Sequence, residues 1–401
     1  MSLKGGFSRA GLSRARRETP GCEEVVHFNN AGASLMPEPV VNATVSHLRL
    51  EARIGGYEAA ERSRTAIERV YDATAALIGC HPDEIAVVEN ATRAWDMAFY
   101  SVPLGPGDRI LTAMAEYASN YIAFLQLARR TGAKVEPVPN DEHGQLSVEA
   151  LREMVDERVK LISITHVPTN GGLVNPAAEV GEVAREAGIL YLLDACQSIG
   201  QLPIDVEAIG CDMLSATGRK YLRGPRGTGF LYVRRDILED LEPPFLDLHA
   251  AEWTGESAFE IRPDARRFEN WETNFAGKVG LGVAVDYALG WGMEPIWERV
   301  RSLAWVLRSR LDDLPGVEIR DLGAERCGIV TFTVEGKYAG EVSRTLSEEG
   351  INTSVSPASS TLLDMRDRSL DALVRASVHY YNTEVEVARF CEVLERSLFR
   401  V

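Results

Sequence analysis

Apolar residues recur along most of the chain in two alternating patterns, helical spacing and short continuous runs. The helical spacing predicts helices over residues 65–78, 92–100, 120–131, 148–155 and 177–187. The short apolar runs predict strands over residues 85–89, 109–113, 134–137, 160–167, 189–195 and 227–233. Because helices separate runs that are apolar on both faces, we expect an α/β fold with a mostly parallel sheet covered on both sides.

The pattern changes after about residue 243, which indicates a second and smaller unit. Residues 243–275 show no regular period. Beyond them the pattern predicts a helical stretch over 277–314 broken near 292–295, strands over 329–334 and 374–377, and helices over 340–349 and 383–398. We therefore expect a flexible, basic N-terminal arm over 1–20, a large domain over 21–285 and a small C-terminal α+β domain over 286–401.

The charge balance narrows the choice of partners. Lys and Arg total 43 and Asp and Glu total 59, which gives a formal net charge of −16. A field of this sign repels phosphates, so we expect neither a nucleic acid nor a membrane as partner. We expect no secretory signal, and none of the six cysteines forms C-x-x-C, which favours reduced thiols in the cytoplasm. The seven histidines show no metal-ligand spacing, so no metal is expected.

One segment combines an acidic strand end with a lysine in a glycine-rich loop. The apolar run 189–195 reaches Asp194 at the edge where open α/β sheets bind ligands. Lys220 follows in SATGRKYLRGPRGTGF, where neighbouring arginines are expected to lower the pKa of its amine. The pair suits pyridoxal phosphate, since an Asp can keep the pyridine nitrogen protonated and a Lys can hold the aldehyde as a Schiff base. A buried Asp that caps a turn and a solvated Lys would show the same spacing.

A phosphate site is predicted where VVENATRAW passes from a strand into a helix. Asn90, Ala91 and Thr92 lie at the helix N-terminus, where free N–H groups, the helix dipole and the Thr92 hydroxyl favour an anion. An ordinary helix cap would use the same residue types.

Together these segments resemble the class V aminotransferase family of pyridoxal-phosphate enzymes (fold type I), which includes the cysteine desulfurases and proteins similar to isopenicillin-N epimerase. The resemblance spans about residues 28–398 and rests on FNNAGASL, ENAT, AEYASN, THVPTNGGLVNP, DACQSIG, TGRK and RASVHYYNT, in this order. It implies that the large domain binds the cofactor, with Lys220 and Asp194 as catalytic residues. The cofactor ligands that it implies are Asn90, Ala91, Thr92, Tyr117 (whose ring would stack on the pyridine), Thr169, Asp194, Gln197, Thr217, Arg219 and Lys220. The substrate ligands that it implies are Asn30, Asn120 and Arg375, of which Arg375 would grip a carboxylate.

The resemblance also implies a homodimer with shared active sites. FENWETNFAG (268–277) resembles the segment that a partner subunit lends to the phosphate site, with Thr273 and Asn274 as candidates. Two departures from the family concern specificity. Members that act as desulfurases carry a mobile-loop cysteine that takes sulfur as a persulfide, but residues 352–365 contain none, and Cys327 lies upstream where a small core residue is typical. The His that often precedes the Schiff-base Lys is replaced by Arg219.

The sequence therefore predicts an enzyme that acts on a small amino acid through an external aldimine. The leading hypothesis is an enzyme similar to the class V aminotransferases, with C–S or another β-elimination without a persulfide cysteine as its nearest specific form. The alternative is a cysteine desulfurase or an epimerase of the same family. Outside the family, a nicotinamide-dependent oxidoreductase would need G-x-G-x-x-G between a strand and a helix, which is absent. A non-catalytic binding protein would have no need of Lys220.

Overall fold

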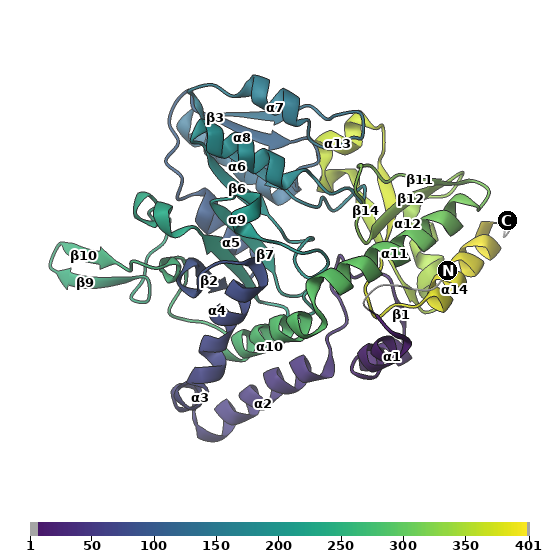
Figure 1. Ribbon diagram of the computed structural model, residues 1–401, viewed down its shortest axis with the longest axis horizontal. Coiled ribbons are helices and arrows are strands. Elements are labelled where there is room, and N and C mark those ends of the chain that lie inside the picture. Colours follow the sequence, from purple (N-terminus) through teal and green to yellow (C-terminus); the bar gives the residue numbers. More distant parts are fainter. Residues whose placement is uncertain (1–6, 399–401) are drawn as a thin grey trace.

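The computed structural model describes residues 7–398 and is built around a seven-stranded sheet (Figure 1). The strands lie in the order β2 (Ile85–Val88), β8 (Gly229–Val233), β7 (Met213–Thr217), β6 (Leu190–Asp194), β5 (Val159–Thr165), β3 (Arg109–Ala113) and β4 (Lys134–Val138). Neighbouring strands from β7 to β4 are parallel, and β8 runs antiparallel to both β7 and β2. The expected α/β fold with a mostly parallel sheet is confirmed.

Helices cover both faces of this sheet because its inner strands are apolar on both sides. Leu192 of β6 packs into one hydrophobic core and its neighbour Leu193 into another, on the opposite face. The helices of this part are α2 (Glu38–Ile54), α3 (Gly56–Arg62), α4 (Arg64–Ile78), α5 (Ala91–Phe99), α6 (Ala118–Thr131), α7 (Val148–Met154), α8 (Ala177–Ala187), α9 (Val206–Ile209) and α10 (Phe275–Trp291). No helix within residues 7–398 is both long and apolar enough to cross a lipid bilayer.

The C-terminal part has its own antiparallel sheet, in agreement with the expected α+β unit. Its strands lie in the order β11 (Val317–Ile319), β12 (Ile329–Val334), β15 (Ala372–Ser377) and β14 (Ser354–Pro357). Its helices are α11 (Met293–Asp312), α12 (Ala339–Glu348), α13 (Leu362–Asp367) and α14 (Glu384–Leu398). A short strand near the N-terminus, β1 (Val26–His27), pairs with β13 (Ile351–Asn352) and so attaches the beginning of the fold to this part. The two separate sheets support a division into two units, and the boundary at residue 285 that we propose falls within α10.

The long helical stretch breaks at Gly292, between α10 and α11. Gly292 has a φ of +84°, which a residue with a side chain adopts only at a cost. Pro295 follows in the first turn of α11, where its missing N–H costs no helical hydrogen bond. The break therefore agrees with the position that the sequence predicts.

A two-stranded hairpin lies within the segment that was expected to be irregular. β9 (Ala251–Gly255) and β10 (Ala258–Ile261) pair with each other and protrude from the large part (Figure 1). Trp253 and Phe259 are directly opposite each other, and they are 80% and 54% exposed. These large apolar residues face outwards rather than into a core. The sequence therefore lacks the alternation of buried and exposed positions by which a strand is recognised.

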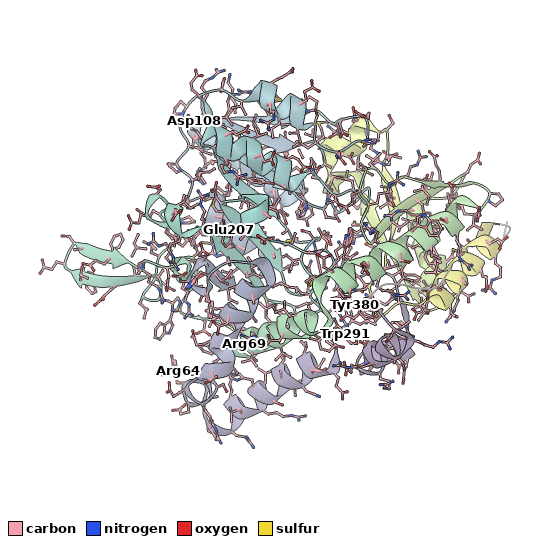
Figure 2. All side chains as sticks on the ribbon, in the orientation of Figure 1. Arg64, Arg69, Asp108, Glu207, Trp291 and Tyr380 are labelled. Carbon is pink, nitrogen blue, oxygen red and sulfur yellow. The ribbon has the colours of Figure 1, made fainter. Side chains whose placement is uncertain are left out.

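Residues 7–20 differ from the expected flexible arm. They form α1 (Arg9–Arg17), and Phe7 stacks on Trp291 and Tyr380 with ring centroids 5.0 and 5.2 Å apart. Trp291 and Tyr380 lie close to one another where α10 ends (Figure 2). These ring contacts hold a segment whose charge pattern suggested a solvated arm, together with polar contacts such as the bond from Arg16 Nη1 to Glu386 Oε1 at 2.8 Å. Residues 1–6 of that arm lie outside the described residues.

Candidate active site

The carboxyl ends of three neighbouring strands place polar side chains at one edge of the large sheet. Thr165 ends β5, Asp194 ends β6 and Thr217 ends β7, and Thr165 pairs with Asp194 in the register of the sheet. Asp194 is 5% exposed, and its Oδ1 accepts the backbone N–H of Cys196 at 2.9 Å. Lys220 follows Thr217 by three residues, so the acid and the lysine singled out in the sequence come to the same edge.

The amine of Lys220 lies among charges but is not engaged by any of them. It forms no hydrogen bond or ion pair within residues 7–398. Burial of the amine lowers the pKa of Lys220; Asp194 opposes this shift, and the cations of Arg219 and Arg375 add to it. Arg219 itself donates to Thr217 Oγ1 at 3.3 Å. The surroundings therefore favour a neutral, nucleophilic amine at Lys220.

The predicted phosphate turn lies at the start of α5, beside β8. Asn90 precedes the helix, and its Oδ1 accepts the backbone N–H of Arg93 at 2.9 Å. The N–H groups of Ala91 and Thr92 have no partner inside the helix, because no helical turn precedes them. Gly229 of β8 packs against this turn so closely that a Cβ atom there would lie 2.7 Å from the Asn90 carbonyl carbon. The side chain of Thr92 is exposed. The helix start can therefore receive an anion.

Tyr117 and Asn120 lie at the start of α6. Asn120 Nδ2 donates to Asp194 Oδ2 and to Glu116 Oε1, in both cases at 2.9 Å. These bonds use both amide hydrogens of Asn120, which therefore supports Asp194 and has no hydrogen left for a substrate. Tyr117 is 38% exposed, and its backbone N–H donates to Glu116 Oε1 at 3.0 Å.

Glu116 is a site residue that the sequence did not reveal. A glutamate beside a turn is usually solvated, but Glu116 is 3% exposed. Burial raises the pKa of Glu116 to about 7; the charge of Asp194 adds to this shift, and hydrogen bonds from Thr165 and Asn120 oppose it. A second carboxyl group therefore lies near Asp194, with the amide of Asn120 bonded to both.

Arg375 is buried in β15, and no carboxylate of residues 7–398 pairs with it. It is 7% exposed, its Nη1 donates to Thr169 Oγ1, and its Nε has no hydrogen-bond partner. Burial lowers the pKa of the Arg375 guanidinium. Because an unpaired buried cation is costly, a ligand carboxylate would be strongly favoured here. Thr169 and Arg375, both singled out in the sequence, are thus in contact.

Gln197 and Asn30 lie where the large and small parts meet. Gln197 Nε2 donates to the Ala31 carbonyl at 3.1 Å, while its Oε1 is buried without a partner in the part of the chain that the structure describes. Asn30 is fully buried, its Nδ2 donates to the Ser377 carbonyl at 2.7 Å, and its Oδ1 accepts the Tyr381 hydroxyl. Gln197 therefore offers a free acceptor to a ligand, whereas the side chain of Asn30 is occupied in joining two segments of the chain.

Thr273 and Asn274 lie apart from these groups, at the start of α10. Asn274 is exposed, and its Oδ1 accepts the backbone N–H of Gly277 at 2.8 Å. Both residues line a small cleft with Gly227 and Thr228, which precede β8. Within residues 7–398 neither side chain forms a hydrogen bond with Asp194 or Lys220.

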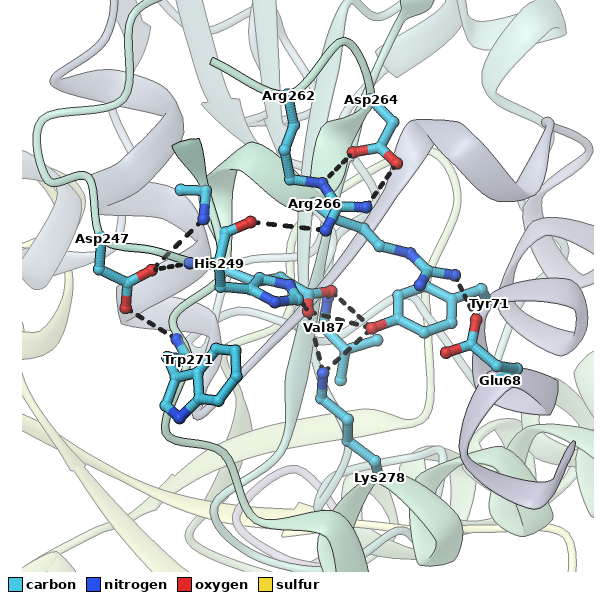
Figure 3. Close-up of polar contacts among 12 residues, drawn as sticks. Glu68, Tyr71, Val87, Asp247, His249, Arg262, Asp264, Arg266, Trp271 and Lys278 are labelled. Carbon is cyan, nitrogen blue, oxygen red and sulfur yellow. Dashed lines mark hydrogen bonds and ion pairs between the residues drawn. The ribbon is translucent and has the colours of Figure 1, made fainter. Parts of the chain in front are cut away.

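A buried acid fixes the beginning of this segment (Figure 3). Glu269 is 1% exposed and accepts bonds from the Tyr71 hydroxyl at 2.8 Å and from Lys278 Nζ at 2.9 Å. His249 Nε2 lies 3.3 Å from the same carboxylate. Burial alone would raise the pKa of Glu269, but the charge of Lys278 and the donated hydrogen bonds outweigh it and lower that pKa to about 2. Glu269 is therefore an anion at neutral pH.

The donors and acceptors at this edge fit pyridoxal phosphate. Asp194 offers an anion for a pyridinium, and Lys220 offers an unengaged amine for an aldehyde. The unpartnered Oε1 of Gln197 can receive a ring hydroxyl, and the start of α5 can receive the phosphate.

Known proteins resemble this chain along almost its full length. The family model described as Aminotransferase class-V matches residues 26–390. A cysteine desulfurase from Haloferax volcanii is 30% identical over 389 residues, which cover 94% of this chain and 90% of the relative. A probable cysteine desulfurase from Xylella fastidiosa (strain Temecula1) is 32% identical over 399 residues, which cover 96% and 94% of the two chains. The apo structure of a cysteine desulfurase from Thermococcus onnurineus matches with a TM-score of 0.90 at 26% identity and covers 96% of this chain and 98% of that one. The chain therefore belongs to the class V aminotransferase family of pyridoxal-phosphate enzymes.

Proposed function

We propose that this enzyme cleaves the carbon–sulfur bond of cysteine or of a cysteine-like amino acid. The relatives are named cysteine desulfurases, which favours the desulfurase alternative over the lyase hypothesis drawn from the sequence. Cleavage of a C–S bond is common to both. The observation that carries the proposal is the unengaged amine of Lys220, which is buried within electrostatic reach of the carboxylate of Asp194 and the guanidinium of Arg375.

We assign the remaining contacts from the positions of the side chains. Pyridoxal phosphate, when bound, withdraws electrons from the α-carbon of an amino-acid substrate. Asp194 would hold its ring nitrogen, Tyr117 its ring face and Lys220 its aldehyde. Its phosphate and remaining polar groups would be held by Asn90, Ala91, Thr92, Thr169, Gln197, Thr217 and Arg219.

Two residues of this chain would act on the substrate itself. Arg375 would bind the α-carboxylate through two parallel N–H···O bonds, which orients the α-carbon. The neutral amine of Lys220 would then take the proton from the α-carbon. Its lowered pKa fits this role, because a base must be unprotonated at the working pH.

The surroundings of the cysteines indicate whether a thiol of the protein can accept the sulfur that leaves the substrate. Residues 352–365 contain no cysteine and form β14 and α13. Cys327 is fully buried, and burial raises the pKa of its thiol to about 12. Burial and the charge of Asp194 also raise the pKa of Cys196, a thiol near Lys220. Because a thiolate is the form that takes sulfur, we propose that sulfur leaves without a protein persulfide. Cysteine and water would then give pyruvate, ammonia and hydrogen sulfide.

The products decide between the two routes. The holoenzyme is incubated with L-cysteine, and sulfide, pyruvate and alanine are measured. Elimination gives equal amounts of sulfide and pyruvate, whereas a desulfurase gives alanine. Alanine without pyruvate would overturn the elimination and establish the desulfurase alternative. A holoenzyme that cleaves no C–S bond but exchanges the α-hydrogen of an amino acid would favour an aminotransferase or an epimerase.

We also propose that two copies form a homodimer in the cytoplasm. Exposed aromatic residues on the hairpin, Trp253 and Phe259, are the kind of surface that a partner subunit covers. Asn274 is exposed and so could reach a partner's phosphate site. All six cysteines are free, as is usual in the cytoplasm. Light scattering should give the mass of a dimer, and Trp253→Ser with Phe259→Ser should weaken both the dimer and cofactor binding. A monomeric wild type with full activity would contradict the proposal.

A further inference from the structure

Glu116 is a buried carboxylate to which the proposed mechanism gives no task. Its Oε1 accepts the N–H of Tyr117 at 3.0 Å and the amide of Asn120 at 2.9 Å. Its Oε2 accepts the N–H of Thr165 at 2.9 Å and the hydroxyl of Thr112 at 3.1 Å. One carboxylate therefore gathers groups from β3, β5 and the start of α6, all beside the end of β6.

Asn120 connects this carboxylate to Asp194. Its amide has two hydrogens, and one goes to Glu116 and the other to Asp194, both at 2.9 Å. If the amide were turned round, its oxygen would face two carboxylates, so this orientation is locked. The other oxygen of Asp194 accepts the N–H of Cys196 at 2.9 Å. Both oxygens of Asp194 are thereby fixed from inside the protein.

We infer that Glu116 is a positioning residue for the cofactor ring, which it serves through Asn120 and Tyr117. Through Asn120 it orients the Asp194 carboxylate that faces the ring nitrogen, and through the Tyr117 N–H it places the side chain that faces the ring. Glu116 thus positions both the residue at the edge of the ring, Asp194, and the residue on its face, Tyr117. The inference rests on the role proposed for Asp194 and concerns the orientation of the bound cofactor.

Two variants of the full chain test this inference. Glu116→Gln keeps the side-chain volume but places an NH2 group where N–H and O–H groups already donate to Glu116. Asn120→Ala removes the amide that bridges Glu116 and Asp194. Both are expected to bind pyridoxal phosphate about tenfold more weakly, as titrations of apoprotein fluorescence would show, because each loses a hydrogen bond to a charged group. Both should also change the visible circular dichroism of the bound cofactor, which reports the orientation of its ring. The losses of affinity should not add in the double variant, because Glu116 and Asn120 share the bridge to Asp194.

Glu84→Gln is the matched control. Glu84 is a buried acid at the far end of β2 that accepts the backbone N–H groups of His81 at 2.8 Å and Arg235 at 2.9 Å. Its loss should lower the apoprotein Tm and leave cofactor affinity and circular dichroism unchanged. If Glu116→Gln and Asn120→Ala behave like this control, the inference is overturned.

Two further outcomes separate this inference from the proposed function. If Glu116→Gln does not fold, Asn120→Ala decides alone, because it leaves the carboxylate and its other bonds in place. An unchanged spectrum in Asp194→Asn would overturn the role of Asp194 itself. A changed spectrum in Asp194→Asn, with unchanged spectra in Glu116→Gln and Asn120→Ala, would overturn only the inference.

Discussion

Lys278 Nζ lies 2.9 Å from Glu269 Oε2, in an ion pair whose side chains are 7% and 1% exposed. Tyr71 donates to the same carboxylate, and the Arg266 guanidinium lies 3.7 Å from the centre of the Tyr71 ring (Figure 3). Glu269 precedes the segment that carries Thr273, and Lys278 follows it. The pair therefore fixes both ends of the segment that we propose to serve a partner subunit.

Breaking this pair should be costly. Lys278→Met keeps most of the side-chain volume but leaves a buried carboxylate without its cation. The free energy of unfolding, measured in urea, is expected to fall by about 3–5 kcal/mol. The control is Arg69→Met at an exposed position (Figure 2); it removes the ion pair of Arg69 with Asp286 and should cost less than about 1 kcal/mol. Equal losses in both variants would contradict the importance of burial.

Stability should depend on acid pH through Glu269. Its pKa is lowered to about 2 in the folded state, against about 4.3 in an unfolded chain. The ionised group therefore stabilises the fold above pH 4.3, and this contribution is lost as the pH falls from there through 2. The shift corresponds to about 3 kcal/mol. Urea unfolding of wild type and Glu269→Gln should differ most at neutral pH and less at pH 3. A difference that does not change with pH would rule out this coupling.

The fold could largely be predicted because apolar periodicity is a local property. The strand over 109–113 and the helix over 177–187 begin and end where the pattern predicts. The hairpin with Trp253 and Phe259 escaped prediction because its apolar residues face outwards. Helix α1 escaped prediction because residues distant in sequence hold it, through the rings that contact Phe7 and the carboxylate of Glu386 that accepts from Arg16.

Those residues of the candidate site could be predicted that are recognised by their residue type and by their position after a predicted strand. Asp194 and Lys220 could be singled out because an acid at a strand end and a lysine in a glycine-rich loop are both readable in the sequence. Glu116 could not, because its burial depends on packing between β3, β5 and α6. The bonds that occupy the amides of Asn30 and Asn120 could not be predicted either, since the partners Ser377 and Asp194 are remote in sequence.

Lys220 should be the residue that carries the cofactor. Borohydride reduction of the holoenzyme, followed by mass spectrometry of its peptides, should find the cofactor attached at Lys220. Lys220→Ala is expected to lose this attachment and to reduce turnover at least roughly 10³-fold, because it removes both the link and the base. Lys160→Ala, which changes an exposed lysine, should change neither. Cofactor attached to another lysine would contradict the assignment of Lys220.

Turnover should not depend on a cysteine of this chain. Cys196→Ser and Cys327→Ser are each expected to stay within a few-fold of wild-type turnover, since burial and, for Cys196, the charge of Asp194 raise the pKa of both thiols. Alkylation of the enzyme during turnover, followed by mass spectrometry, should find no persulfide. Loss of activity in Cys196→Ser, with the fold and bound cofactor intact, would instead identify a desulfurase with a relocated sulfur acceptor.

Arg375 should create the requirement for a substrate carboxylate. Its guanidinium is buried, and among the described residues it has no carboxylate partner and no partner for Nε, so a bound carboxylate would remove an unpaired buried charge. Arg375→Lys keeps the charge but cannot form two parallel bonds to a carboxylate. We expect it to weaken binding of an amino acid by about 2–5 kcal/mol, measured as a raised KM, with an unchanged cofactor spectrum.

The decarboxylated amine of the same substrate is the control for Arg375. It offers no carboxylate, so wild type and Arg375→Lys should act on it with nearly equal kcat/KM. A structural role of Arg375, through its bond to Thr169, would instead lower kcat/KM for both compounds and reduce the Tm. Equal losses of kcat/KM for the amino acid and the amine would show that Arg375 supports the loop that carries Thr169 and does not recognise the substrate.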